Sequence, residues 1–212
     1  MKKISPAEER LRASYGELRS REAEKVNRLV SAATRGDIAA FESAMQDLWD
    51  GGDLLQRAFG AVCRLQRVPP EIKEYFLQKW IRDGDAIRDE FRKDRFLLPV
   101  LRTLLPPYEG PAVRLYRGDS AFNRRRRSYG MSWSAHREVA ERFALGIWRT
   151  FKGGSVLLET VAPPEAIICA VHLHDDNFKE AEYLVDRRRL PLVKVLARFS
   201  EEPPIKRPDT AG

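Results

Sequence analysis

The sequence predicts an α+β protein in which an all-helical N-terminal domain precedes a mainly antiparallel domain. From about residue 6 to 105, apolar residues recur at spacings of three and four, the period of an amphipathic helix. After residue 111 the apolar runs become short, rich in β-branched and aromatic residues, and separated by Gly, Pro and Asp. PPYEGP, residues 106–111, is rich in helix breakers, so we place the boundary there and expect domains at 1–105 and 106–200.

Three segments of the first domain show the helical period most clearly. PPEIKEYFLQKWI opens with prolines, which the first turn of a helix tolerates, and DIAAFESAMQDLW and LLQRAFGAVCRL place apolar residues on one face. We interpret these stripes as the core of a helical bundle. The residues expected on them are Ile38, Phe41, Met45, Leu48, Leu55, Phe59, Val62, Leu65, Ile72, Phe76 and Trp80.

The second domain contains strand-like runs and one amphipathic helix. The runs are AVRLYRG, SVLLETV, AIICAVHL, AEYLV and PLVKVLARF. The helix AHREVAERFALGIW interrupts them, and Ser134 is expected as its N-cap. We assign residues 201–212 to a disordered tail. The apolar face expected for the helix consists of Val139, Ala140, Phe143, Ala144 and Ile147.

Length and composition indicate a folded protein, since the chain has 212 residues and a hydrophobic fraction of 43%. No apolar run reaches the length of a membrane span, and the N-terminus lacks a signal-peptide core, so we expect a cytoplasmic protein without membrane contact; a leaderless exported effector would look the same. Cys63 and Cys169 are expected as buried thiols. His172 and His174 alternate along an expected strand without further ligands, so we expect no metal site.

The formal charge of +7 lies mostly in the C-terminal half. Residues 111–212 hold 18 Lys and Arg against 13 Asp and Glu, and the remainder holds 20 against 18. This balance suits a dinucleotide, a nucleic acid or an acidic protein surface. The runs Arg124–Arg127 and Arg187–Arg189 are interpreted either as solvated loops or as contacts to phosphate.

Three short motifs of the second domain bring charged and hydroxyl groups together. LYRG ends an expected strand with Arg117, whose planar guanidinium suits phosphate oxygens, followed by Gly118, which permits close approach to the backbone. Arg114 should point to the opposite face and is a poorer candidate. MSWS, just before the helix, places Ser132 and Ser134 on one face, although serines there commonly serve only as caps.

The third motif is NFKEAEYLVD, in which Glu180 and Glu182 stand one residue apart. If they lie on a strand, both side chains project from one face, roughly 6 to 7 Å apart. A charged pair at a strand edge is also a common device against aggregation. The pair therefore suggests a site only in combination with the other motifs.

The order of these motifs resembles that of the mono-ADP-ribosyltransferases of the Arg-Ser-Glu class, whose fold is shared by many bacterial toxins. The order is an arginine at a strand end, then Ser-x-Ser, then Glu-x-Glu. The resemblance covers about residues 112–199 and implies a two-sheet catalytic domain. The helical domain carries no matching motif. Trp133 departs from the family's usual Ser-Thr-Ser.

The resemblance implies that NAD is a co-substrate. Glu182 matches the catalytic glutamate, which would hold the ribose hydroxyl and offset the positive charge that develops when the nicotinamide bond breaks. Ser132 would orient Glu182. The residues expected to bind NAD are Arg117, Gly118, Ser132 and Ser134.

Glu180 matches the position that engages the acceptor, where a glutamate usually accompanies arginine as the target. We therefore expect a macromolecular acceptor, first of all a protein arginine. Phe178 lies where the family often has an aromatic residue for target recognition, and ordinary packing is the alternative. Rival interpretations are nucleic acid as acceptor, hydrolysis of NAD by water, and a non-catalytic basic module that binds nucleic acid.

Overall fold

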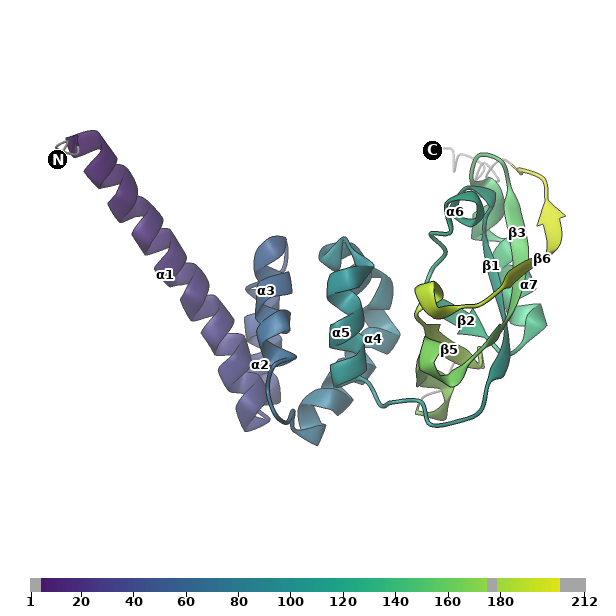
Figure 1. Cartoon of the computed structure of the whole chain (residues 1–212), viewed down its shortest axis with the longest axis horizontal. Helices are drawn as coiled ribbons and strands as arrows, with labels where there is room; N and C mark the ends of the chain where they lie inside the picture. The colour runs from purple at the N-terminus through teal and green to yellow at the C-terminus, as the bar shows by residue number, and fades with distance from the viewer. Residues whose placement is uncertain (1–4, 175–178, 203–212) are drawn as a thin grey trace, which may run out of the picture. The chain divides into compact units, whose positions relative to one another are not determined.

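The computed structural model describes residues 5–174 and 179–202. The chain divides into two compact units, Met1–Leu105 and Pro106–Gly212, at the place where the breaker-rich PPYEGP segment begins (Figure 1). Among the described residues no helix is long and apolar enough to cross a bilayer.

The first unit is a helical bundle with an aromatic core. The ring of Phe59 packs against the rings of Phe41, Phe76 and Phe91, with centroids 5.5 to 6.1 Å apart. The expected bundle core is thus confirmed at Phe41, Phe59 and Phe76, whereas Ile38, the first residue of its helix, is 41% exposed. The helices are α1 (Pro6–Arg35), α2 (Ile38–Gln46), α3 (Asp53–Val62), α4 (Pro70–Phe91) and α5 (Asp94–Leu104).

The second unit combines strands with short helices, as expected, but the run AIICAVHL leaves the sheet early. Its strand ends at Ala170 and a 3-10 turn follows, so the prediction that His172 and His174 alternate along a strand is wrong. The elements are β1 (Val113–Ser120), α6 (Ala121–Arg126), β2 (Ser132–Ser134), α7 (Arg137–Leu145), η1 (Ile147–Thr150), β3 (Ser155–Ala162), η2 (Pro164–Ala166), β4 (Ile167–Ala170), η3 (Val171–Leu173), β5 (Glu182–Val185), η4 (Arg187–Arg189) and β6 (Val193–Phe199).

The described strands form one antiparallel sheet in the order β4-β5-β2-β1-β3-β6, whereas the family resemblance implied two sheets. We call the junction of β1 and β2 the seam. There Tyr116 pairs with Ser134, the single residue pair that joins these two strands in the described sheet. Longer ladders connect β1 to β3 and β2 to β5, so the seam is the narrowest link.

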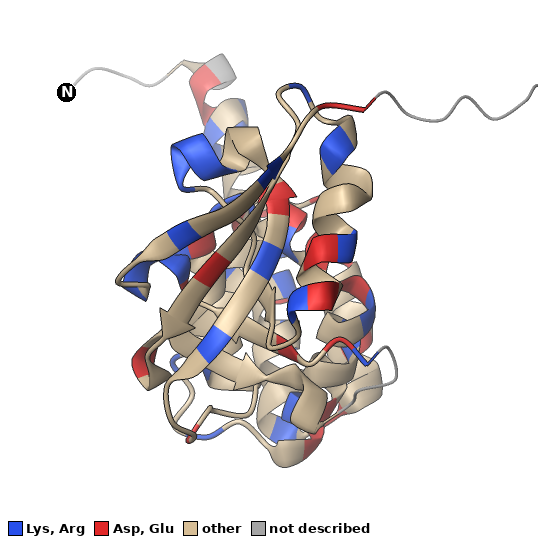
Figure 2. Cartoon of the chain, turned by 90° about the vertical axis from the view of Figure 1, so that its right-hand side faces the viewer, with Lys and Arg blue, Asp and Glu red and all other residues tan. Residues whose placement is uncertain are grey.

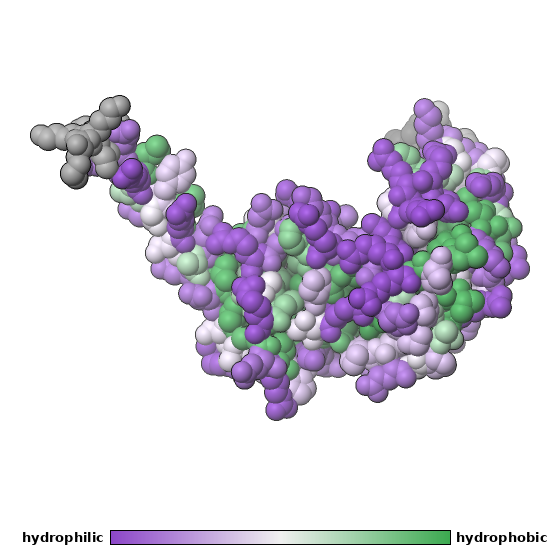
Figure 3. All heavy atoms as spheres, in the orientation of Figure 1, coloured by the Kyte–Doolittle hydropathy of each residue, from purple (hydrophilic) through white to green (hydrophobic). Residues whose placement is uncertain are grey.

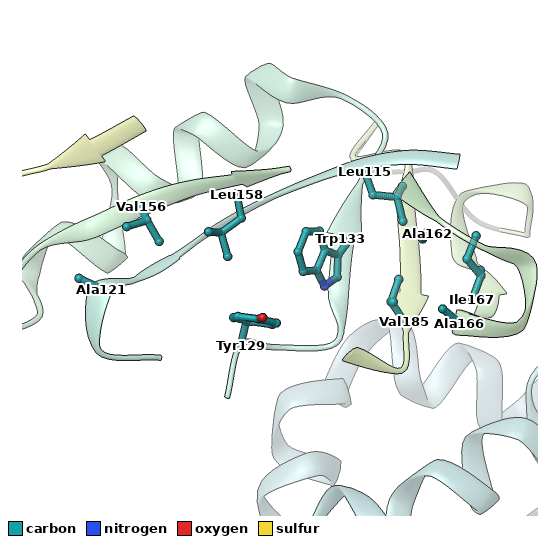
Figure 4. Close-up of a cluster of buried hydrophobic side chains, with 10 residues drawn as sticks. All are labelled: Leu115, Ala121, Tyr129, Trp133, Val156, Leu158, Ala162, Ala166, Ile167 and Val185. Carbon is teal, nitrogen blue, oxygen red and sulfur yellow. The ribbon is translucent and has the colours of Figure 1, made fainter. Parts of the chain in front are cut away.

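The core of the second unit lies on one face of the sheet and is built around Trp133 (Figure 4). This side chain is 1% exposed, meets the ring of Tyr129 edge to face at 6.0 Å, and donates from Nε1 to the carbonyl of Gly130 at 3.3 Å. Leu115 and Leu158 belong to the same cluster. Because side chains alternate along a strand, an inward Trp133 directs its two serine neighbours to the opposite face.

Helix α7 packs on that opposite face, but its apolar face is narrower than predicted. Ala140 and Ala144 are buried against the sheet, as expected. Phe143 is 45% exposed and Ile147 is 64% exposed, so the prediction is wrong for these two residues. The chain leaves the α-helical path after Leu145, which explains why Ile147 does not continue the stripe.

Candidate active site

The three sequence motifs lie on three adjacent strands, β5, β2 and β1. In register, Glu182 lies opposite Ser134, and Ser134 lies opposite Tyr116. Side chains that face each other across strands share a face, so Glu182 and Ser134 are direct neighbours. Ser132 lies opposite Leu184, two pairs further along the ladder. Ser134, rather than the predicted Ser132, is therefore the serine paired with Glu182 in register.

Arg117 is held at the seam by two contacts. Its Nε donates to Asp119 Oδ2 at 2.7 Å, and its Nη1 donates to the carbonyl oxygen of Ser132. The side chain is 13% exposed, and its guanidinium lies 6.0 Å from the ring centroid of Trp148. Strand alternation sends Arg117 out of the face opposite to Glu182. Its guanidinium nevertheless reaches the β2 backbone, because β1 and β2 share a single residue pair.

Asp119, which the sequence analysis did not select, is fully buried and fixes Arg117 in place. Besides the Arg117 contact, its carboxylate accepts hydrogen bonds from the backbone amides of Ser120 and Gly130 and from the side-chain amide of Asn123. A buried carboxylate with four donors is well satisfied. The signal was present in the sequence: Asp119 stands two residues after Arg117 and so shares its face of the strand.

Gly118 has a clear packing role. A Cβ placed there would lie 2.3 Å from the carbonyl oxygen of Ala140 and 2.3 Å from the amide nitrogen of Ala144. The glycine therefore lets α7 pack directly on β1. The expected role in admitting NAD to the backbone stays a prediction, and the space beside its Cα is already filled by α7.

Ser134 does not act as the predicted N-cap of the following helix, because the N-cap residue of α7 is His136. The buried hydroxyl of Ser134 instead accepts a hydrogen bond from the amide of His136 at 2.9 Å and donates one to the carbonyl oxygen of Glu180 at 2.6 Å. The amide of Ala135 also donates to the carbonyl oxygen of Ala181 at 3.1 Å. These bonds tie the end of β2 to the Glu-x-Glu motif.

The backbone of the Glu-x-Glu motif differs from the predicted strand. β5 begins at Glu182, and Lys179 and Ala181 have positive φ values of 51° and 44°. Positive φ is rare for residues with a Cβ and clusters at functional sites. The prediction that Glu180 and Glu182 share a face by strand alternation is therefore wrong, since Glu180 precedes the strand and a left-handed residue separates the two.

Glu182 lies close to a buried thiol. Burial first, and then the charge of Glu182, raise the pKa of Cys169 to about 12. His172 places its Nδ1 3.2 Å from the carbonyl oxygen of Glu182, and its ring packs at a tilt against the ring of Tyr183, with the centroids 4.7 Å apart. Cys169 is buried, as expected, whereas Cys63 is only half-buried, and both are free thiols. Phe178 lies outside the described residues, as does most of the expected tail.

Two arginine clusters flank the motifs, and neither is a simple loop. Arg124–Arg126 form the last turn of α6, and Arg127 caps it in a left-handed conformation; cations are favourable at a helix C-terminus. The second cluster follows Asp186, which is 4% exposed and accepts hydrogen bonds from the backbone amide and guanidinium of Arg188. Figure 2 shows basic residues spread over this unit, with acidic residues among them.

Within residues 5–174 and 179–202, His, Cys, Asp and Glu side chains form no group of three that could hold a metal ion. Comparison of the chain with protein-family models, with curated proteins and with solved structures finds no match. The functional argument therefore depends on the geometry of the motifs alone.

Proposed function

We propose that the second unit is an NAD-dependent mono-ADP-ribosyltransferase whose first-choice acceptor is a protein arginine. The observation that carries the proposal is that three motifs distant in sequence lie on adjacent strands and are bonded to one another. Arg117 donates to the backbone of Ser132, and Ser134 donates to the backbone of Glu180. A charged pair acting only against aggregation would not require these links to two other motifs.

The proposed roles follow from the chemistry of each group. NAD supplies a glycosidic bond whose cleavage develops positive charge on the ribose, and a nearby carboxylate stabilises such a charge. Glu182 takes that role. Arg117 is the proposed contact of the diphosphate, although it leaves β1 on the face opposite to Glu182 and its guanidinium is 13% exposed and already bonded to Asp119 and Ser132. Ser132 stays the proposed contact of the ribose, while Ser134, which lies opposite Glu182, positions the backbone that carries both glutamates.

Glu180 is the proposed acceptor residue. A carboxylate there binds the guanidinium of an incoming arginine and makes its nitrogen a better nucleophile. The left-handed residues on either side of it, Lys179 and Ala181, set its position relative to β5. Strained backbone of this kind is retained when the surrounding structure fixes it, and here Ser134 and Ala135 supply the fixing bonds.

The test uses purified full-length protein with labelled NAD and a lysate, following nicotinamide release and label in the protein and nucleic-acid fractions. Glu182→Gln should lower turnover at least about a hundredfold, the scale of losing one preorganised electrostatic group. Glu159→Gln is the matched control, because Glu159 lies on β3 opposite Tyr116 and forms an exposed ion pair with Arg114. Equal activity of wild type and Glu182→Gln would refute the catalytic assignment.

The same experiment separates the acceptor classes. Glu182-dependent label in the protein fraction supports a protein arginine as the acceptor. Label in the nucleic-acid fraction would mean that the protein is still an ADP-ribosyltransferase but that its acceptor is nucleic acid. Nicotinamide release without label indicates transfer to water. Glu180→Gln should impair transfer more than it impairs release; equal loss of both would argue against Glu180 as the acceptor residue.

A further inference from the structure

Helix α1 is far longer than the helices that cover it. It has 30 residues, about 45 Å at the usual rise, whereas its two neighbours α2 and α3 have 9 and 10 residues, about 14 and 15 Å. Among the side chains of α1 that the structure describes, from residue 8 onward, Leu29 is the first that is fully buried. The N-terminal half of the helix therefore extends beyond α2 and α3 within its own unit (Figure 1).

The extended half carries an apolar stripe formed by Leu11, Tyr15 and Leu18, which are 57%, 57% and 53% exposed. Their spacing of four and three residues puts them on one face. Leu29 lies on the same face three turns further along, where the helix packs into its bundle. Figure 3 shows hydrophobic atoms among hydrophilic ones on this part of the helix. The stripe thus continues a core-facing surface past the end of its own core.

The borders of this stripe are basic. On the helical period Arg12 and Arg19 lie along one border and Arg21 lies along the other. All three side chains are exposed. An apolar stripe with arginines on both sides fits a ligand with an apolar centre and acidic edges.

The two acidic residues beside the stripe are already engaged within the unit. Glu8 accepts a hydrogen bond from the amide of Ser5 at 2.7 Å and completes a capping box. Glu22 pairs with Arg57 of α3 at 2.8 Å and marks the point where the stripe meets the bundle. In the described part of α1, neither glutamate forms an ion pair with Arg12, Arg19 or Arg21. These three arginines outnumber Glu8, whose carboxylate stays charged and lies one turn before Arg12.

A second copy of α1 would be a poor match for this surface. Antiparallel pairing centred on Tyr15 would set Arg12 beside Arg19 of the other helix, and like charges there are repulsive. Parallel pairing would set Arg19 beside Ser14 and supply no acidic partner. Charge complementarity favours a helix of a different, acidic protein.

We propose that the N-terminal half of α1 is a docking surface for an acidic amphipathic helix of a partner protein. Apolar side chains of that helix cover Leu11, Tyr15 and Leu18, and its carboxylates lie beside Arg12 and Arg19. This is the helix-on-helix mode of recognition, with anchors at spacings of three and four. The proposal does not depend on the enzymatic activity of the second unit.

The experiment measures binding of a labelled synthetic helix to the full chain by fluorescence anisotropy. The probe carries leucine at the a and d positions and glutamate at the e and g positions of its heptads, and the control peptide replaces each glutamate with glutamine. We expect the acidic peptide to bind at least about tenfold more tightly at low salt, and this preference to shrink at high salt, because the charges are exposed.

Two variants of the protein separate the apolar and charged contributions. The double substitution Leu11→Gln and Leu18→Gln should weaken binding of the acidic peptide at least about tenfold. Glutamine preserves the helix because its helix propensity is close to that of leucine. Arg12→Gln with Arg19→Gln should remove the preference for the acidic peptide. Circular dichroism checks that both remain helical.

Three results would overturn the proposal: no binding of the acidic peptide, equal binding of the two peptides, or binding unaffected by the leucine substitutions. A fourth result that would overturn the proposal comes from sedimentation of the unliganded protein. A dimer that Leu11→Gln with Leu18→Gln dissolves would mean that a second copy, and not an acidic partner, occupies the stripe.

Discussion

The hydroxyl of Ser134 donates a 2.6 Å hydrogen bond to the carbonyl oxygen of Glu180, so a residue of the central strand β2 directly holds the segment that leads into β5. The Oγ of Ser134 also accepts a hydrogen bond from the amide of His136 at 2.9 Å. One buried side chain thereby satisfies two backbone groups from segments that are remote in sequence. The geometry of the Glu-x-Glu motif depends on this bridge.

Ser134→Ala removes that bridge. It leaves a carbonyl and an amide unsatisfied in a buried setting, so we expect the free energy of unfolding to fall by about 1–3 kcal/mol. Urea unfolding measures the loss. Ser132→Ala is the control, since the carbonyl of Ser132 that binds Arg117 is retained, and its effect should stay within about 0.5 kcal/mol. Equal effects of the two substitutions would contradict a special role for Ser134.

Asp119→Asn should destabilise the second unit strongly. The substitution replaces one carboxylate oxygen by an NH₂ group that faces N–H donors, and it leaves the guanidinium of Arg117 without its buried counter-charge. Loss of one partner from a buried ion pair costs about 3–5 kcal/mol. Arg114→Gln breaks an exposed pair with Glu159 and should cost about 1 kcal/mol or less. Denaturant titration of both variants checks the contrast, and a mild Asp119→Asn would refute it.

Two glycine-to-alanine substitutions should have opposite signs. Gly118→Ala forces a methyl group against the backbone of α7, so we expect a loss of at least about 1–3 kcal/mol. Gly16→Ala adds a methyl group where no atom lies within 4 Å, in the interior of α1, and should stabilise by about 0.5–1 kcal/mol. Thermal unfolding distinguishes them. A neutral Gly118→Ala would show that α7 can move away from β1 at little cost.

The stability of the protein should depend on Cys169 at alkaline pH. Burial and the charge of Glu182 raise the pKa of this thiol from 9.0 to about 12, so between these values the unfolded chain loses a proton that the folded chain keeps. Stability therefore falls as pH rises through this window. Cys169→Ala should show a shallower decline in urea unfolding between pH 9 and about 12. Parallel curves for the two proteins would mean that the thiol ionises equally in both states.

The sequence predicted the order of the elements better than their geometry. The helical period and the breaker-rich PPYEGP segment correctly separated the bundle from the strands, because both are local signals. The strands that carry the three motifs, β1, β2 and β5, lie side by side, but alternation places Arg117 on the face opposite to Ser134 and Glu182. The left-handed backbone at Ala181 could not be read from the sequence, since alanine rarely adopts it and tertiary hydrogen bonds enforce it here.

Other differences also have tertiary causes. Serine is a favoured N-cap residue, and Ser134 stands just before the helix in the sequence. In the structure its hydroxyl donates to the carbonyl oxygen of Glu180, and α7 begins later, at Arg137. Trp133 looked like a departure from a catalytic motif, and it is the central core residue of the sheet. Asp119 stands two residues after Arg117, so strand alternation alone places the two side chains on one face.

The seam gives the sheet a mechanical property that its regular strand order conceals. With one residue pair between β1 and β2, strands β4, β5 and β2 form one panel of the sheet and β1, β3 and β6 form another. The proposed catalytic Glu182 lies on one panel, and the proposed phosphate-binding Arg117 lies on the other. The hydrogen bond from Arg117 to Ser132 and the core cluster that unites Trp133 with Leu115 and Leu158 also cross the seam, so the separation of these two charges depends on side-chain contacts more than on a backbone ladder.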